Sequence, residues 1–152
     1  MGDLSHLDTE GRARMVDVGP KKPQRRMARA SGTIALAPAT CDLIRRDAIA
    51  KGSVLTVAEI AGIQAAKRTA ELIPLCHPLS LDHVAVTLEL EGAGVTAASE
   101  VSCTGRTGVE MEALTAVSVA LLTVYDMCKA VDPRMQIGPI VLVEKVKFDD
   151  EG

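Results

Sequence analysis

The segment from Glu110 to Val131 constrains the fold of this chain more than any other feature. Its middle, ALTAVSVALLTV, is apolar on nearly every face of a helix. Since such a helix has almost no polar face for water, it must be buried against a sheet or a partner subunit. Aromatic residues make up only 1% of the chain, so the surrounding core must consist of Ala, Val, Leu, Ile and Met.

Periodicity and turn signals predict the remaining elements. We expect strands at 33–36, 83–90, 95–103 and 137–148, and helices at 38–51 and 56–72. Thr40 is the expected N-cap of the first helix, Gly52 its stop, and Pro74 prevents the second helix from continuing. This order is that of a ferredoxin-like α+β domain with one extra helix: an antiparallel four-stranded sheet with helices packed on one face.

Residues 1–31 have a different character from the rest of the chain. They hold seven of the 17 basic residues and show little apolar periodicity. We interpret them as a mobile basic N-terminal arm in front of a single ferredoxin-like domain over 32–152. The arm is either a solvated tail or a segment that folds over an anionic ligand.

Composition excludes several functional classes. The net charge of -3 argues against a general polyanion binder, and two aromatic residues cannot form a stacking platform for single-stranded nucleic acid. Four cysteines without a C-x-x-C pair match neither a zinc knuckle nor a disulfide framework. With a polar N-terminus and no apolar run of the ~18 residues that span a bilayer, we expect a cytoplasmic protein without membrane association.

The stretch ELIPLCHPL, residues 71–79, places a thiol beside an imidazole between two prolines. It could be a metal corner, a nucleophile with its base, a working histidine beside a packing cysteine, or only a buried turn. Neighbouring side chains of an extended segment point to opposite sides, which disfavours a Cys-His dyad or a shared metal. We therefore expect Cys76 to be buried and His77 to face a site, without further zinc ligands at usual spacing.

The stretch TGRTGVEMEAL, residues 104–114, leads into the long helix. Backbone N–H groups at a helix start can hold an anion, although this is not a Walker A loop. Glu110 and Glu112 both lie in the first turn, where carboxylates stabilise the helix dipole. If one of them serves chemistry, the other caps or pairs.

Asp126 and Lys129 share a face at the far end of the same helix. They form either a surface ion pair or a partly buried proton donor and acceptor. Fourteen residues separate Glu112 from Asp126, which is about 21 Å along a helix axis. One small substrate cannot contact both within a subunit, so they serve different roles or the site is assembled from two subunits.

Four long stretches, LSHLDTEGRARMVDV, KGSVLTVAEIAGIQAAKRTAELIPLCHPL, TGRTGVEMEALTAVSVALLTVYDMCKAVD and the closing strand, resemble the cyclic pyranopterin monophosphate synthase (MoaC) family. The resemblance runs from about Leu4 to Lys145. It implies a lyase of molybdenum cofactor biosynthesis that rearranges a cyclised dihydroguanosine triphosphate and releases pyrophosphate. A radical GTP cyclase would supply this substrate. The resemblance also implies a homohexamer, a trimer of dimers, with sites at the dimer interfaces.

The resemblance carries site residues over position by position. Its catalytic residues fall on Lys51, His77, Glu112, Asp126 and Lys129, with Asp126 as the proton-transfer group. Its substrate contacts fall on Leu75, Cys76, His77, Met111 and Glu112, and the matching arm holds Arg26 and Lys21. The implied chemistry consists of proton transfers and a phosphoryl displacement, so no redox cofactor is required. Mg²⁺ bound to the triphosphate is compatible with the sequence, but no protein-bound metal is expected.

Three departures from the family pattern occur. Gln64 and Gln24 replace a common Met and Thr, and the tail Glu144–Gly152 keeps Lys145 but lacks the family's glycines. Three other functions are compatible with parts of the sequence: a non-catalytic nucleotide-sensing module, a zinc hydrolase centred on Cys76 and His77, and a purely structural oligomer. Retention of Asp126 with Lys129 favours the enzyme.

Overall fold

The computed structural model describes residues 6–149, so the first five residues of the expected arm and the last three of the tail lie outside it. Eight elements follow one another in that range: β1 (Gln24–Ala35), α1 (Pro38–Arg45), α2 (Val54–Lys67), α3 (Thr69–Leu72), β2 (His83–Glu91), β3 (Gly94–Gly105), α4 (Glu110–Cys128) and β4 (Gln136–Lys147). The strands form one antiparallel sheet in the order β2-β3-β1-β4. This is the predicted ferredoxin-like arrangement.

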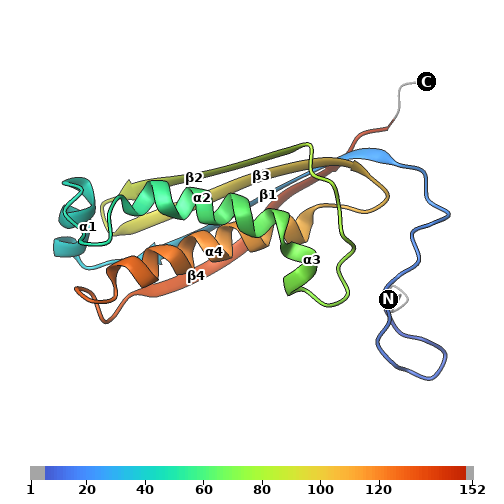
Figure 1. The fold of residues 1–152 in the computed structure, drawn as a ribbon, viewed down its shortest axis with the longest axis horizontal. Helices are drawn as coiled ribbons and strands as arrows, with labels where there is room; N and C mark the ends of the chain where they lie inside the picture. The colour runs from blue at the N-terminus through green and yellow to red at the C-terminus, as the bar shows by residue number, and fades with distance from the viewer. Residues whose placement is uncertain (1–5, 150–152) are drawn as a thin grey trace.

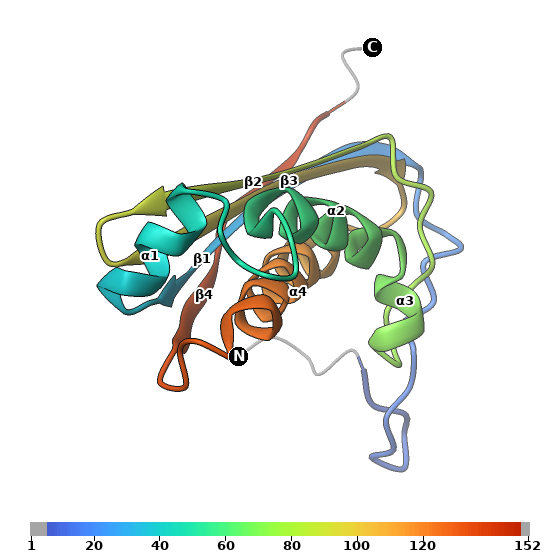
Figure 2. The ribbon, with the colours of Figure 1, turned by 60° about the vertical axis from the view of Figure 1, so that its left-hand side comes forward.

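The helices cover one face of the sheet (Figures 1 and 2). α4 packs on β1 and β3, and α2 packs beside it against β2 and α4. The largest fully buried side chains are aliphatic, with Ile34, Val95 and Val101 from the sheet facing Val117 and Leu121 of α4. By length and hydropathy alone α4 could cross a membrane, but 56% of that window is buried in the protein. It is the core helix that the sequence predicted.

β1 begins at Gln24, nine residues before the predicted start at Thr33. Residues 24–31, which the sequence analysis assigned to the arm, therefore pair with β3, and residues 26–31 also pair with β4. The alternation of buried and exposed residues in this segment is weak in the sequence. Its buried positions are Ala28 and Ala30, whereas Arg25 and Arg29 face solvent. Alanine gives only a weak hydrophobic signal, and the arginines raise the polarity of the segment.

α1 differs from its prediction at both ends. Ala37, not Thr40, occupies the N-cap position, and Thr40 is buried in the first turn. The helix ends at Arg45, before Gly52, because Asp47 adopts a left-handed backbone with φ 52. The N–H groups of Asp47 and Ala48 then bond the carbonyls of Ile44 and Leu43, which is the Schellman motif.

The predicted helix over 56–72 is two helices, with the break at Arg68. The hydroxyl of Thr69 donates to the carbonyls of Ala65 and Ala66, at 3.1 and 3.0 Å. These bonds satisfy carbonyls that a continuing helix would bond with its own N–H groups. The break turns α3 away from α2 and directs the following loop toward the start of α4 (Figure 1).

Candidate active site

Lys51, Asp126 and Lys129 meet at the C-terminal end of α4. We call them the Lys-Asp-Lys cluster. Lys51 Nζ lies 2.8 Å from Asp126 Oδ2, and Lys129 Nζ lies 2.7 Å from Asp126 Oδ1. Each carboxylate oxygen therefore has its own ammonium group. Lys51 arrives from the loop between α1 and α2, and it also donates to the main-chain carbonyl of Asp126 at 2.9 Å.

The electrostatics of this cluster follow from two cations on one anion. The hydrogen bond and charge of Lys129, and then those of Lys51, lower the pKa of Asp126 to about 2. Asp126 in turn raises the pKa of Lys129. About half of each side chain is exposed, so this is an open, net-positive cluster and not the buried pair that the apolar helix allowed. It is accessible to an anionic ligand from solvent.

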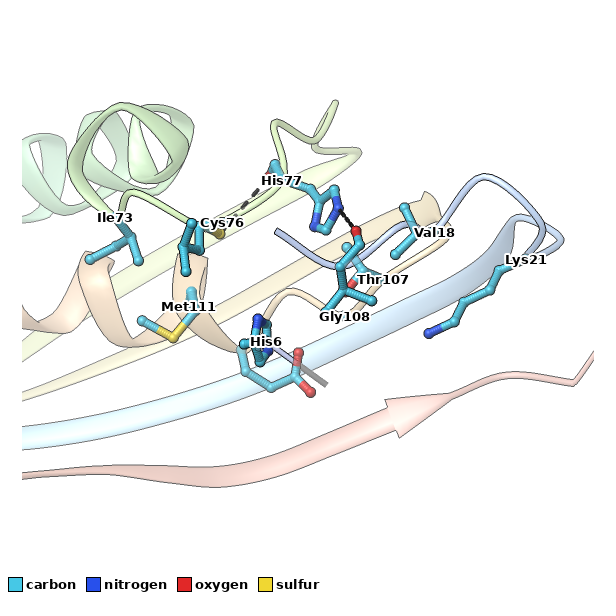
Figure 3. Close-up of a pocket in the computed structure, with 12 residues that line it drawn as sticks. His6, Val18, Lys21, Ile73, Cys76, His77, Thr107, Gly108 and Met111 are labelled. Atoms are coloured by element: carbon cyan, nitrogen blue, oxygen red, sulfur yellow. Dashed lines mark hydrogen bonds between the residues drawn. The ribbon is translucent and has the colours of Figure 1, made fainter. Parts of the chain in front are cut away.

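A cavity of about 430 Å³ lies at the opposite end of α4 (Figure 3). We call it the arm cavity because one wall comes from the N-terminal segment. Its lining comes from the segment before β1 (His6, Val16, Val18, Lys21), the loop after α3 (Ile73, Leu75, Cys76, His77) and the start of α4 (Thr107, Gly108, Glu110, Met111). Five of the predicted substrate-binding residues therefore line one cavity: Lys21, Leu75, Cys76, His77 and Met111.

His77 connects the arm to this cavity. Its ring atom Nε2 lies 2.6 Å from the main-chain carbonyl oxygen of Val16 (Figure 3). Because a carbonyl can only accept, Nε2 must carry the hydrogen in this arrangement. The described part of the arm thus lies against the cavity here, and its folding over an anionic ligand stays a prediction.

Cys76 is half-buried and lines the cavity beside His77, so the expectation of a buried cysteine is wrong. Residues 73–76 form a turn, closed by a bond from Cys76 N–H to the Ile73 carbonyl, and not the extended segment assumed from the prolines. Cys76 Sγ lies 3.8 Å from Glu112 Oε1. Burial, and then the charge of Glu112, raise the pKa of this thiol, so it is protonated at neutral pH.

The two first-turn glutamates of α4 have different surroundings. Glu110 lines the arm cavity, and its Oε1 lies 3.3 Å from Lys145 Nζ. Glu112 is only 3% exposed and lies behind Cys76, with Oε2 lacking a hydrogen-bond partner. Burial raises the pKa of Glu112. Glu112 therefore supports the cavity wall from behind, and Glu110 contributes the carboxylate on its surface.

Arg26 lies in a neighbouring cavity of about 240 Å³, which shares Gly108 and Glu110 with the arm cavity. Lys145 and Lys147 of β4 complete its basic lining. Among residues 6–149, the buried Nε atom of Arg26 has no hydrogen-bond partner. Lys21 lines the adjacent arm cavity. Together with Arg26, Lys145 and Lys147, it makes this end of the molecule able to bind anionic groups.

The structure thus separates the predicted site residues into two groups at opposite ends of α4. The sequence did not single out His6 or Val16 as cavity residues, because their positions depend on how the arm folds back, whereas Thr107 and Glu110 lie in the stretch that it named as a candidate anion site. Within residues 6–149, no group of three or more His, Cys, Asp or Glu side chains could hold a metal ion. All four cysteines are free thiols.

A ferredoxin-like sheet, a cavity with a basic neighbouring cavity and an open Lys-Asp-Lys cluster define an α+β protein with exposed cationic groups at both ends of α4. The chain belongs to the MoaC family, whose model matches residues 15–147. It is 60% identical over 144 residues to cyclic pyranopterin monophosphate synthase of Chloroflexus aggregans, covering 93% of this chain and 87% of that protein. It is 59% identical over 145 residues to cyclic pyranopterin monophosphate synthase 3 of Mycobacterium bovis, covering 95% and 82%.

Proposed function

We propose that this protein is a cyclic pyranopterin monophosphate synthase of molybdenum cofactor biosynthesis. It would convert a cyclised dihydroguanosine triphosphate to cyclic pyranopterin monophosphate and release pyrophosphate, as a lyase. The observation that carries this proposal is the 60% identity over nearly the whole chain to a protein of that name. The geometry of the Lys-Asp-Lys cluster supports it, because a purely binding module needs no carboxylate between two lysines.

The cluster supplies the proton-transfer groups. The reaction opens the five-membered ring of the purine, closes a new ring and forms a cyclic phosphate as pyrophosphate leaves. Asp126 accepts and returns protons when the substrate displaces an ammonium group from one of its oxygens, which restores its basicity. Lys51 and Lys129 donate protons and offset the negative charge that develops on the leaving phosphate groups.

The arm cavity and its basic neighbour supply the binding groups. Leu75, Cys76, His77 and Met111 would contact the ring system, and Glu112 would fix the Cys76 segment from behind. Arg26, Lys21 and Lys145 would hold the phosphates, together with the free N–H groups at the start of α4. Mg²⁺ could enter as part of the substrate's triphosphate, and the proposal assigns it no ligand in the protein.

The proposal includes a site shared between two protomers. α4 separates the cavity from the cluster by about 21 Å along its axis, so a single substrate cannot bridge them within one chain. A homohexamer built as a trimer of dimers would place the cluster of one protomer against the cavity of its partner. The enzyme would act in the cytoplasm, downstream of a radical GTP cyclase and without nucleic acid or membrane partners.

A turnover assay with the purified chain and the cyclised triphosphate tests this function. We expect stoichiometric release of pyrophosphate and cyclic pyranopterin monophosphate, both identified by mass spectrometry. Replacing Asp126→Ala should lower kcat by about 10²–10⁴-fold, the usual contribution of a general acid–base group. The oligomeric state of the variant should match that of the wild type. Absence of product from the wild-type chain, or normal turnover by the variant, would overturn the proposal.

A further inference from the structure

Asp132, in the loop after α4, is a buried carboxylate that the proposed chemistry does not use. It is only 4% exposed. Its Oδ2 accepts a hydrogen bond of 2.8 Å from the main-chain N–H of Ala37, the N-cap residue of α1. Its Oδ1 lies 3.4 Å from the N–H of Arg134, and the hydroxyl of Thr40 also hydrogen-bonds the carboxylate. The start of α1 is therefore capped by a side chain from 95 residues further along the chain.

A short loop, residues 46–50, connects the end of α1 to Lys51. The Schellman ending of α1 is followed by buried Ile49, and the N–H of Gly52 bonds the Ile49 carbonyl at 3.0 Å. Between the end of α1 and Gly52, the chain is held by the Asp47, Ala48 and Gly52 N–H bonds and by the buried Ile49 side chain. A displacement at the start of α1 would be transmitted to the ammonium group of Lys51.

Asp132 is also fixed relative to α4. Its own N–H bonds the carbonyl of Cys128 at 3.0 Å, one residue before Lys129. The contacts form a closed ring: α4 holds Asp132, Asp132 holds α1, α1 carries Lys51, and Lys51 returns to Asp126 on α4. Figure 1 shows α1 and the C-terminal end of α4 at the same end of the molecule.

We propose that Asp132 is a positioning residue, which ties the start of α1 to the end of α4 and thereby places Lys51 on the carboxylate of Asp126. The catalytic consequence rests on the proposed synthase function, whereas the structural link between Asp132 and Lys51 does not. Asp132 itself touches no substrate in this account. Its effect on turnover passes entirely through Lys51.

Two variants and one matched control test this link. Asp132→Ala removes both acceptor oxygens, and Asp132→Asn retains a carbonyl oxygen for the Ala37 N–H. Asp42→Ala serves as the control, because Asp42 lies on the exposed face of the same helix and pairs only with Arg45. If Asp132→Ala fails to fold, Asp132→Asn still provides the comparison.

Hydrogen exchange followed by mass spectrometry gives the readout that does not depend on activity. We expect amide exchange in the peptide covering residues 46–52 to accelerate about tenfold or more in Asp132→Ala, less in Asp132→Asn, and not at all in Asp42→Ala. Unchanged exchange in that peptide would overturn the proposal. The exchange measurement tests the structural link between Asp132 and Lys51 even if the wild-type chain has no synthase activity.

A double-mutant cycle gives the catalytic readout. We expect Asp132→Ala to lower kcat by about 10–10²-fold with little change in KM, because a misplaced catalytic group has this cost. In a Lys51→Ala background the same change should have no further effect on kcat, since the residue through which Asp132 acts is already gone. A merely structural role predicts the same loss in both backgrounds, and that outcome would contradict the proposal.

Discussion

Asp126 is ionised in the resting protein over the whole physiological pH range, because two ammonium groups hold its pKa near 2. In that state it is a poor base. Its folded-state pKa lies below the usual 3.8, so it contributes stability that is present above pH 3.8 and lost as pH falls through about 2. The proposed mechanism therefore requires the substrate to separate the carboxylate from a lysine. The ion pairs are the resting form of the site.

Glu112 presents the opposite situation, because burial raises its pKa above the usual 4.5. The folded chain then binds more protons than the unfolded chain above pH 4.5, so this residue lowers stability as pH rises. We predict that Glu112→Gln differs little from the wild type below pH 4.5. Above it, the variant should gain about 1–3 kcal/mol relative to the wild type, the cost of a buried unpartnered group.

Urea unfolding at one fixed protein concentration, repeated across a pH series, measures this difference. The comparison between pH values is the test, because any packing change caused by the amide appears equally at all of them. Parallel stability curves for Glu112→Gln and the wild type would show that Glu112 is not desolvated in the folded protein.

At the scale of elements, α2 and α4 approach closely because Gly62 has no side chain. A Cβ placed there would lie 2.9 Å from the Ala116 carbonyl oxygen and 2.9 Å from Val86 Cγ1. The backbone oxygen cannot move without distorting α4. This contact sets the distance between α2 and α4, and α2 lies between the loop that carries Lys51 and α3, which leads to Cys76 and His77.

We predict that Gly62→Ala destabilises the protein by about 1–3 kcal/mol, the usual cost of overpacking a core. Helix propensity alone would favour alanine by about 1 kcal/mol, so the sign of the effect separates the two explanations. Gln64→Ala, at an exposed position of the same helix, should change stability by no more than about 0.5 kcal/mol. Thermal or urea unfolding of both variants makes the measurement, and a stabilised Gly62→Ala protein would contradict the close contact.

The sequence predicted the elements whose signals are local. The β2–β3 hairpin, α4 and β4 were found because their patterns and turn residues lie within the segments themselves. It did not predict the start of β1, where alanines occupy the buried positions, or the N-cap of α1. The N-cap residue is Ala37, whose N–H bonds the carboxylate of Asp132, and no local pattern connects two residues so distant in the chain.

The candidate site was predictable to a similar degree. The resemblance selected Lys51, Asp126 and Lys129, and the structure places both ammonium groups within 3 Å of the Asp126 carboxylate. The different environments of Glu110 and Glu112 could not be predicted. They depend on which side of the first turn of α4 faces Cys76, and this depends on the break at Arg68.

At the scale of the whole molecule, the length of α4 determines how far apart the two groups of candidate site residues lie. It holds the Lys-Asp-Lys cluster and the arm cavity apart, although the proposed reaction needs both around one substrate. The proposed resolution is a second protomer, which brings the cluster of one chain to the cavity of the other. This is the central claim of the proposed mechanism.

Subunit complementation tests that claim most directly. Asp126→Ala and His77→Ala chains should each be nearly inactive when assembled alone. When the two are coexpressed in equal amounts, half of the dimers are mixed, and each mixed dimer contains one site with both residues intact. We predict recovery of about a quarter of wild-type turnover, because one of the two sites in half of the dimers is restored. Mixed assemblies as inactive as either parent would show that each site is built within a single chain.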